Sequence, residues 1–114
     1  RYIRNSIRSN SHLAIKCEKC LDDLIAMQEG DFSIFGVGDL AETLYDLSAK
    51  KNIRVHAIYD TFAGGMFHGL DVLPLVDLKK YQGKVILGTL DRLGERVEKL
   101  KSLGVGLDRI IVLL

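Results

Sequence analysis

A glycine-containing turn constrains the fold of this chain more than any other feature of its sequence. The short apolar run Phe32 to Phe35 ends in Gly36-x-Gly38-x-x-Ala41, and a helical pattern begins at once. Glycines in such a turn allow a sharp change of chain direction and a close approach of the backbone to a ligand. The stretch therefore predicts a strand–turn–helix unit, which in open α/β sheets borders the ligand crevice.

Strand-like and helical patterns alternate over residues 31–114, which we expect to form one domain. The expected strands are 32–35, 53–59, 70–75, 84–87 and 109–113, and the expected helices are 39–51, 76–81 and 93–103. Such alternation predicts a three-layer αβα domain with a parallel five-stranded sheet and right-handed crossovers, in the strand order 3-2-1-4-5. Pro74 fits the third strand only near an edge or an end, because it lacks a backbone N–H.

Residues 1–30 precede this alternation, and we expect them to form an arm and a helix. The stretch Arg1 to Asn10 is polar and aperiodic, and its arginines favour a solvated arm over a nucleic-acid or membrane patch. Ser11 can cap a helix that runs to about Gln28, with Gly30 as its stop. One stripe of this helix is apolar, so the helix packs on the sheet or joins a neighbouring domain or a second copy.

The composition is that of an ordinary globular domain. The chain has 114 residues, of which 47% are hydrophobic and 27% charged, with a formal net charge of +1. No apolar run approaches the roughly 20 residues of a membrane helix, and no signal-peptide pattern is present. We therefore expect a cytoplasmic location, with no membrane span and no nucleic-acid partner. Because the chain begins without Met and ends inside an apolar run, we expect it to be a piece of a longer protein.

Cys17 and Cys20 form an isolated Cys-x-x-Cys pair inside the first helical pattern. A thioredoxin-type motif would follow a strand and open a helix, whereas this pair does neither. A zinc site would need a second Cys/His pair, which the spacing of His12, His56 and His68 does not supply. We therefore expect two thiols on or beside a buried helix face, in a reducing compartment, and no metal site.

The expected strand order places a crevice between the first and fourth strands. The residues expected to edge this crevice and to hold a ligand are Gly36, Val37, Gly38, Asp39, Leu40, Asp60, Thr61, Gly88 and Thr89. Asp60 lies about 20 residues after the glycine turn, where an acidic residue can hydrogen-bond a ribose hydroxyl. An acidic residue at the end of a strand is just as often a simple turn residue.

Asp39 argues against a phosphate at the glycine turn. Asp39 and Glu42 have the spacing of a capping box, in which the Asp39 carboxylate would occupy amides that an anion would use. Its charge would also repel a nearby phosphate. Two interpretations therefore remain, a ligand-binding turn and a degenerate turn that is purely architectural.

Residues suited to catalysis are few. His56 alternates with apolar residues on a strand and is expected to be a satisfied sheet residue, and no Ser or Cys lies in a nucleophile elbow. His68 lies in the loop 61–69 without an identifiable carboxylate or nucleophile partner. This loop, which contains Phe62, Met66 and Phe67, forms a lid, a contact patch or a loop folded onto its own domain. We expect no catalytic residue in the isolated domain.

The order of signals from Phe32 to Leu113 resembles that of small Rossmann-like modules in sugar-processing proteins. It runs IFGVGDLAETL, VHAIYD, GLDVLPLVDL, KVILGTLDRLGERVEKLKSLGV and DRIIVLL. Such modules form the N-terminal domains of sugar O- and N-acyltransferases and the C-terminal domains of some sugar methyltransferases and glycosyltransferase-associated proteins. The pattern is also similar to the NAD(H)- or CoA-binding domains of redox repressors and acyl-CoA synthetases.

The resemblance implies a ligand and a set of roles. Gly36, Gly38 and Ala41 would hold the turn, the amides from Val37 to Leu40 would face a phosphate, and Asp60 would bind a ribose or sugar hydroxyl. The ligand would be NAD(H) or a nucleotide-sugar, within a larger sugar-modifying or regulatory protein, a redox sensor included. The acyltransferases carry a second Gly and a His where Asp39 and Leu40 stand here, so no acyl-transfer base is carried over.

A second hypothesis treats the module as a scaffold that binds no ligand. It would then associate with other domains or form a homodimer through the 13–28 helix and the apolar residues of the 61–69 loop, because clustered exposed apolar side chains usually mark an interface.

Overall fold

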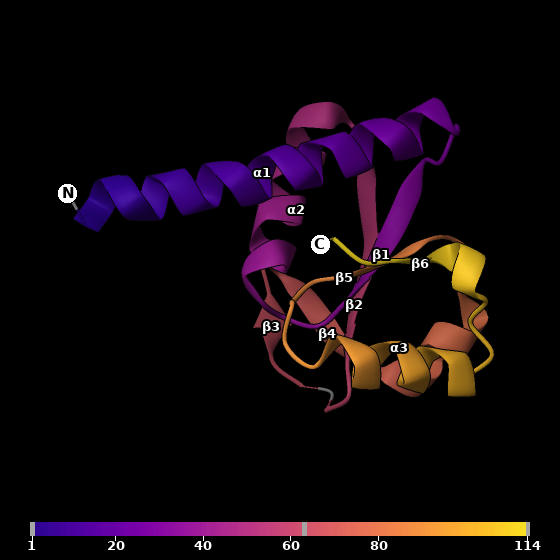
Figure 1. Cartoon of the computed structure of the whole chain (residues 1–114). Coiled ribbons are helices and arrows are strands. Elements are labelled where there is room, and N and C mark those ends of the chain that lie inside the picture. Colours follow the sequence, from indigo (N-terminus) through magenta and orange to yellow (C-terminus); the bar gives the residue numbers. More distant parts are fainter. Residues whose placement is uncertain (1, 63, 114) are drawn as a thin grey trace.

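The computed structural model describes residues 2–62 and 64–113, with side chains described from residue 12 onward. A single six-stranded sheet organises the chain, in the order β3-β4-β2-β1-β5-β6 (Figure 1). Its strands are β1 (Asp31–Phe35), β2 (Arg54–Asp60), β3 (Met66–Phe67), β4 (Leu70–Pro74), β5 (Val85–Leu87) and β6 (Ile110–Ile111). All pairings are parallel except that of β3 with β4. The predicted α/β class is confirmed, and the sheet, which was predicted to be parallel, is mostly parallel because β3 runs antiparallel to β4.

Three α-helices and two short 3-10 helices accompany the strands in the described part of the chain, and α1 precedes the first strand. The α-helices are α1 (Tyr2–Ala26), α2 (Asp39–Lys51) and α3 (Leu93–Ser102), and the 3-10 helices are η1 (Leu75–Lys80) and η2 (Leu107–Arg109). Among the described residues, no helix combines the length and the apolar character that a membrane crossing requires.

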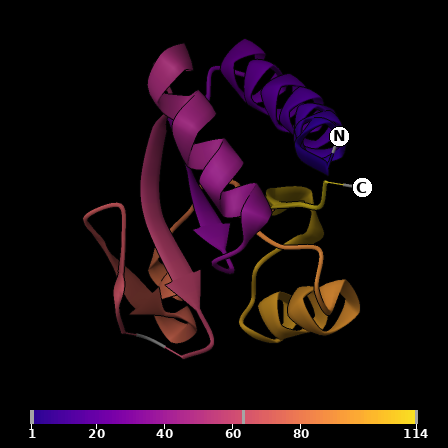
Figure 2. The same ribbon diagram turned by 90° about the vertical axis from the view of Figure 1, so that its left-hand side faces the viewer.

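Apolar side chains are buried on both faces of the sheet. On one face, side chains of α1 and α2 such as Leu21 and Leu44 form one cluster with Phe32 and Ile34 of β1. On the other face, Phe35 joins side chains from η1 and α3 in a second cluster. Figure 2 shows α1 and α2 side by side at one face and α3 at the opposite face. Burial on both faces explains why the strands read as continuous apolar runs.

The prediction of a frayed arm before Ser11 was wrong, because α1 already begins at Tyr2 and runs through Ser11. The stretch before Gly30 contains neither glycine nor proline, so no residue in it interrupts a helix. The helix ends at Ala26, two residues before Gln28, which adopts a left-handed conformation with φ of 64°. From Leu13 onward α1 packs on the sheet and α2, which is one of the predicted alternatives.

The prediction of five strands missed β3. Met66–Phe67 pairs antiparallel with the start of β4 through a two-residue turn at His68 and Gly69, whose φ values are 50° and 81°. Positive φ at both central positions matches the right-handed twist of a hairpin and is typical of a type I′ turn. Much of the 61–69 loop is therefore folded onto its own domain, with Phe67 buried and Phe62 exposed. Pro74 ends β4, as predicted.

Candidate functional site

The glycine turn after β1 packs directly against the turn after β5. Gly88 N–H donates to the Phe35 carbonyl at 2.8 Å, and the Gly88 carbonyl accepts from Ala41 N–H at 3.0 Å. A Cβ on Gly88 would lie 2.2 Å from the Gly36 carbonyl oxygen, and one on Gly38 would lie 2.9 Å from the Gly88 carbonyl oxygen. The two turns therefore approach each other so closely that Gly38 and Gly88 are required by packing alone.

Gly36 meets a second requirement, because its φ is 104°. Its N–H donates to the Tyr59 carbonyl at 2.9 Å, which fixes the end of β1 against β2. A Cβ here would lie 3.1 Å from Nη1 of Arg96. The strand–turn–helix prediction is thus confirmed, and an arginine from α3 lies against the turn.

The predicted capping box is wrong, because α2 begins one residue earlier than that box requires. Gly38 occupies the N-cap position, and no side chain there makes a capping hydrogen bond. Asp39 is the first helical residue, and its carbonyl accepts from the Thr43 hydroxyl at 3.1 Å. The Asp39 carboxylate therefore does not occupy the first amides of α2. One of these amides, that of Ala41, is instead bound by Gly88.

A cavity of about 420 Å³ opens at the carboxyl end of β1 and β2, between these strands and α3. Its volume falls within the range of small-molecule sites. It is lined by Phe35, Asp60, Thr61, Phe62, Arg92, Glu95, Arg96 and Lys99. We call it the carboxyl-edge crevice. Of the predicted site residues, only Asp60 and Thr61 line it.

Arg96 lies at the centre of the contacts in this crevice. Its Nε donates to the Asp91 carbonyl at 3.0 Å, and its guanidinium lies over the Phe35 ring at 5.1 Å. Nη1 is 4.0 Å from Oδ1 of Asp60, the outer limit of an ion pair. The side chain is 20% exposed, so the charge is held in place and partly shielded from water. A guanidinium held in this way offers its remaining N–H groups to a carboxylate or phosphate.

The crevice is richer in cations than in carboxylates. Arg92, Arg96 and Lys99 contribute three positive charges, and Asp60 and Glu95 contribute two negative ones. Within residues 12–62 and 64–113, neither Arg92 nor Lys99 forms an ion pair. Arg92 precedes α3 with φ of 53°, a conformation that costs free energy in an arginine. The arrangement can attract and hold an anion.

Asp60 is the last residue of β2, at the rim of the same crevice. Its Oδ1 accepts from the N–H of Thr61 at 2.7 Å and is also the atom that faces Arg96. The carboxylate therefore has the local hydrogen bond of a turn residue, and it lies beside the glycine turn as its spacing predicted.

Three of the other predicted site residues border a different cavity. Asp39, Leu40 and Thr89 line a space of about 210 Å³ together with Asp91. The Thr89 hydroxyl accepts from Asp91 N–H at 3.1 Å. Two carboxylates and no cation line this space, so it disfavours an anion. The glycine turn, which includes Val37, separates an acidic side from the basic crevice.

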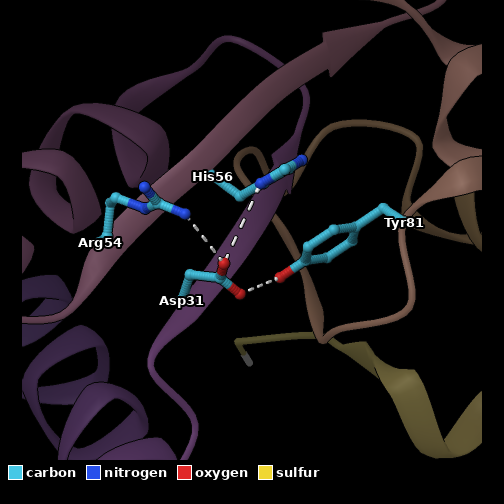
Figure 3. A network of polar contacts seen from close by, with 4 residues as sticks. All are labelled: Asp31, Arg54, His56 and Tyr81. Carbon is cyan, nitrogen blue, oxygen red and sulfur yellow. Dashed lines mark hydrogen bonds and ion pairs between the residues drawn. The ribbon is translucent and has the colours of Figure 1, made fainter.

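A polar cluster at the opposite, amino end of β1 and β2 has no counterpart in our predictions (Figure 3). Asp31 accepts from the Tyr81 hydroxyl at 2.9 Å and lies 3.5 Å from Nη2 of Arg54 and 4.0 Å from Nδ1 of His56. The His56 and Tyr81 rings stack with centroids 4.5 Å apart. Burial and the Asp31 carboxylate raise the pKa of Tyr81. The polar groups of this cluster are therefore each other's partners. His56, on β2, belongs to the cluster as a sheet residue.

His68 has a carboxylate partner that the sequence reasoning did not find. Its Nε2 lies 2.5 Å from Oε2 of Glu42, and its ring stacks on Tyr45 with centroids 4.3 Å apart. Glu42 comes from α2, so only the tertiary structure brings the pair together. The pair fastens the β3–β4 hairpin to α2, and no nucleophile is among its contacts in the described residues.

Cys17 and Cys20 are buried free thiols on the sheet-facing side of α1, as predicted. Burial raises the pKa of each to about 11. Both are therefore protonated and unreactive near neutral pH. No group of three potential ligands for a metal ion occurs among the described residues.

Our sequence reasoning missed the basic residues of α3. Arg96 and Lys99 are three residues apart and share one face of α3, and Arg92, four residues before Arg96, immediately precedes the helix. That periodicity, on a helix that follows a strand, was the available signal. Comparison with protein-family models and with curated proteins finds no match for the chain.

Proposed function

We propose that residues 31–113 form a Rossmann-like αβα module whose carboxyl-edge crevice binds a nucleotide, a nucleotide-sugar or an NAD-like ligand. The observation that carries this proposal is the position of Arg96 between Gly36 and Asp60, in a crevice with an excess of cations. Ligands of open parallel sheets bind outside the carboxyl ends of the strands, which is where this crevice lies.

The phosphate of the ligand is the group that Arg96 would bind. At 4.0 Å the contact between Arg96 and Asp60 is weak, so a phosphate that accepts two N–H bonds from the guanidinium replaces it at little cost. Lys99 of α3 and Arg92, which precedes α3, line the same crevice and add to the attraction. Charge–charge attraction between partly shielded groups is stronger than in bulk water.

The other lining residues suit the remaining parts of a nucleotide. Asp60, released from Arg96, accepts a hydrogen bond from a ribose or sugar hydroxyl. Phe62 is 86% exposed at the mouth of the crevice and presents a ring on which a base can stack. In this proposal Gly36, which has no side chain, leaves room for the ligand to reach Arg96. Asp39 lies outside the crevice, in the acidic cavity on the other side of the turn.

The parent of this module, in the same proposal, is a larger sugar-modifying or regulatory protein of the cytoplasm. The resemblance to modules of sugar-processing proteins supports this assignment. The domain supplies binding, and chemistry belongs to another part of the parent protein.

Calorimetric titration with ADP, NAD⁺, NADH, CoA and UDP- and CDP-sugars tests the proposal. We expect one of these classes to bind, and Arg96→Gln to weaken that binding at least about tenfold, the loss of one charge-assisted contact. Lys101→Gln is the matched control, because Lys101 lies on the same helix but pairs with Glu98 away from the crevice. Absence of binding across the panel, or equal binding by Arg96→Gln, contradicts the proposal.

The mutual packing of Gly38 and Gly88 favours a second candidate, a scaffold whose glycine turn is purely architectural. The close approach of the two turns accounts for both glycines without any ligand. A panel without binding, from a chain that shows a cooperative unfolding transition, would support this candidate instead.

A further inference from the structure

The glycine turn after β1 faces the protein's own atoms where a dinucleotide-binding turn faces its ligand. In a dinucleotide site the second glycine of such a turn lets the pyrophosphate approach the backbone. Here a Cβ on Gly38 would lie 2.9 Å from both the Gly88 carbonyl oxygen and Cβ of Thr89. A Cβ on Gly36 would lie 3.0 Å from Cγ2 of Thr89. The turn after β5, and Thr89 in particular, therefore fills the space through which a pyrophosphate would reach the glycines.

The two sides of the glycine turn also differ in charge. On the crevice side, Nη1 of Arg96 would be 3.1 Å from a Cβ on Gly36. On the other side, the charged residues that line the acidic cavity of about 210 Å³ are the carboxylates Asp39 and Asp91. A dinucleotide that extended across the turn would pass Thr89 and bring its phosphates toward two like charges. The packing and the charges therefore both keep phosphates on the Arg96 side.

The crevice side can take several phosphates of one nucleotide. Arg96 and Lys99 are three residues apart on α3, a rise of about 4.5 Å along the helix. Both line the crevice, and Arg92 lines it just before the helix begins. Successive phosphates of a single nucleotide can therefore each meet a cation, while Asp60 and Phe62 of the same crevice remain for the sugar and the base.

We propose that the ligand of the carboxyl-edge crevice contains a single nucleoside, with all its phosphates on the Arg96 side of the glycine turn. Nucleoside diphosphates and nucleotide-sugars meet this requirement, and dinucleotides such as NAD⁺ do not. The inference rests on the proposed function, because it takes the crevice as the ligand site. It goes further by assigning to Thr89 and Asp39 the exclusion of a second nucleoside.

Calorimetric titration at about 0.15 M salt with ADP, UDP, CDP, UDP- and CDP-sugars, NAD⁺ and NADH tests this inference. We expect a compound with one nucleoside to bind most tightly, and NAD⁺ and NADH to bind at least about tenfold more weakly than it. If either dinucleotide comes within about tenfold of that compound, the inference is overturned while the proposed function stands. If no compound binds, both fail.

Asp39→Asn locates the phosphates. Asp39 is exposed at the first position of α2, so the substitution leaves the fold intact. With the phosphates on the Arg96 side, screening at this salt concentration keeps the change in affinity below about threefold. Phosphates over the first amides of α2 would instead bind more tightly once the Asp39 charge is removed.

A gain above about threefold in Asp39→Asn therefore overturns the inference. Arg96→Gln is the reference variant, because it should weaken the same ligand at least about tenfold.

Discussion

The two ends of β1 and β2 each carry a cluster of polar side chains, and the clusters differ in how fully their groups are hydrogen-bonded or paired. At the amino end, Asp31 accepts a 2.9 Å hydrogen bond from Tyr81, while His56 stacks on the same tyrosine ring. At the carboxyl end, Arg96 and Asp60 are 4.0 Å apart. The amino end therefore contributes stability, whereas the carboxyl end keeps hydrogen-bonding capacity that the proposed ligand would use.

The physical basis of this difference is where each group finds its partner. A buried or half-buried polar group is costly unless it is hydrogen-bonded, and the partners of Asp31 come from two segments of this chain, β2 and the residue that follows η1. Arg92 and Lys99 remain in contact with water and form no ion pair in the part of the chain that the structure describes. A charge in water can pair with an incoming anion without losing an internal contact.

The largest effect is expected from Gly88→Ala, which tests whether the close packing of the two turns at the carboxyl edge stabilises the fold. The new Cβ would meet the Gly36 carbonyl oxygen at 2.2 Å, so the two turns must separate. We expect the free energy of unfolding, measured with urea, to fall by about 3 kcal/mol.

Gly94→Ala is the control for this substitution. Gly94 lies in α3, and a Cβ there meets nothing within 4 Å. We expect it to be neutral or to stabilise by up to about 1 kcal/mol. Similar losses in the two variants would show that the close approach of the turns is not what requires Gly88.

A smaller effect, confined to stability, is expected from Tyr81→Phe at the amino end. Removing the hydroxyl deprives Asp31 of its shortest hydrogen bond and should cost about 1.5 kcal/mol in urea unfolding. Ligand affinity in the crevice should not change.

Arg96→Gln should show the opposite pattern. Its long contact with Asp60 contributes less than about 1 kcal/mol to stability, whereas the proposed ligand binding depends on Arg96. If Tyr81→Phe weakened ligand binding as much as Arg96→Gln does, the division between the two ends would be wrong.

The smallest effect is a loss of stability at alkaline pH. Burial raises the pKa of Cys17 and Cys20 from 9.0 to about 11, and the pKa of Tyr81 lies above its usual 10.0. A pKa raised by folding stabilises the protein fully below the unfolded value, and this contribution is lost as pH rises through the folded value. Urea midpoints should therefore fall from about pH 9 upward. In Tyr81→Phe the fall above pH 10 should be shallower, and an equal slope would contradict this assignment.

Local sequence patterns were enough to predict the parallel α/β sheet and the turn at Gly36. Apolar runs, helical periodicity and glycine spacing are local properties. They predicted the first and last residues of β1, β2 and β4 to within one or two residues. The β3–β4 hairpin was missed because it has only two residue pairs and because its His68-Gly69 turn resembles a flexible loop in composition.

The candidate site was predicted only in part. Asp60 and Thr61 were identified from their spacing after the glycine turn, and both line the crevice. Asp39, Leu40 and Thr89 were placed at the correct edge of the sheet but border the acidic cavity, because residue order does not reveal which side of a turn a side chain faces. Arg96 reaches Gly36 and Asp60 from a helix far along the chain.

The sequence by itself determined the class of the fold, the buried thiols and the position of the glycine turn between β1 and α2. Each of these depends on patterns within a single segment. Tertiary structure alone decided that the turns of Gly38 and Gly88 pack against each other and that Glu42 binds His68 instead of capping α2. It also decided that the cations of α3 line the same crevice as Asp60. The physical reason is that these contacts join segments that are distant in sequence. Such segments come together only when the chain has folded and both faces of the sheet are covered.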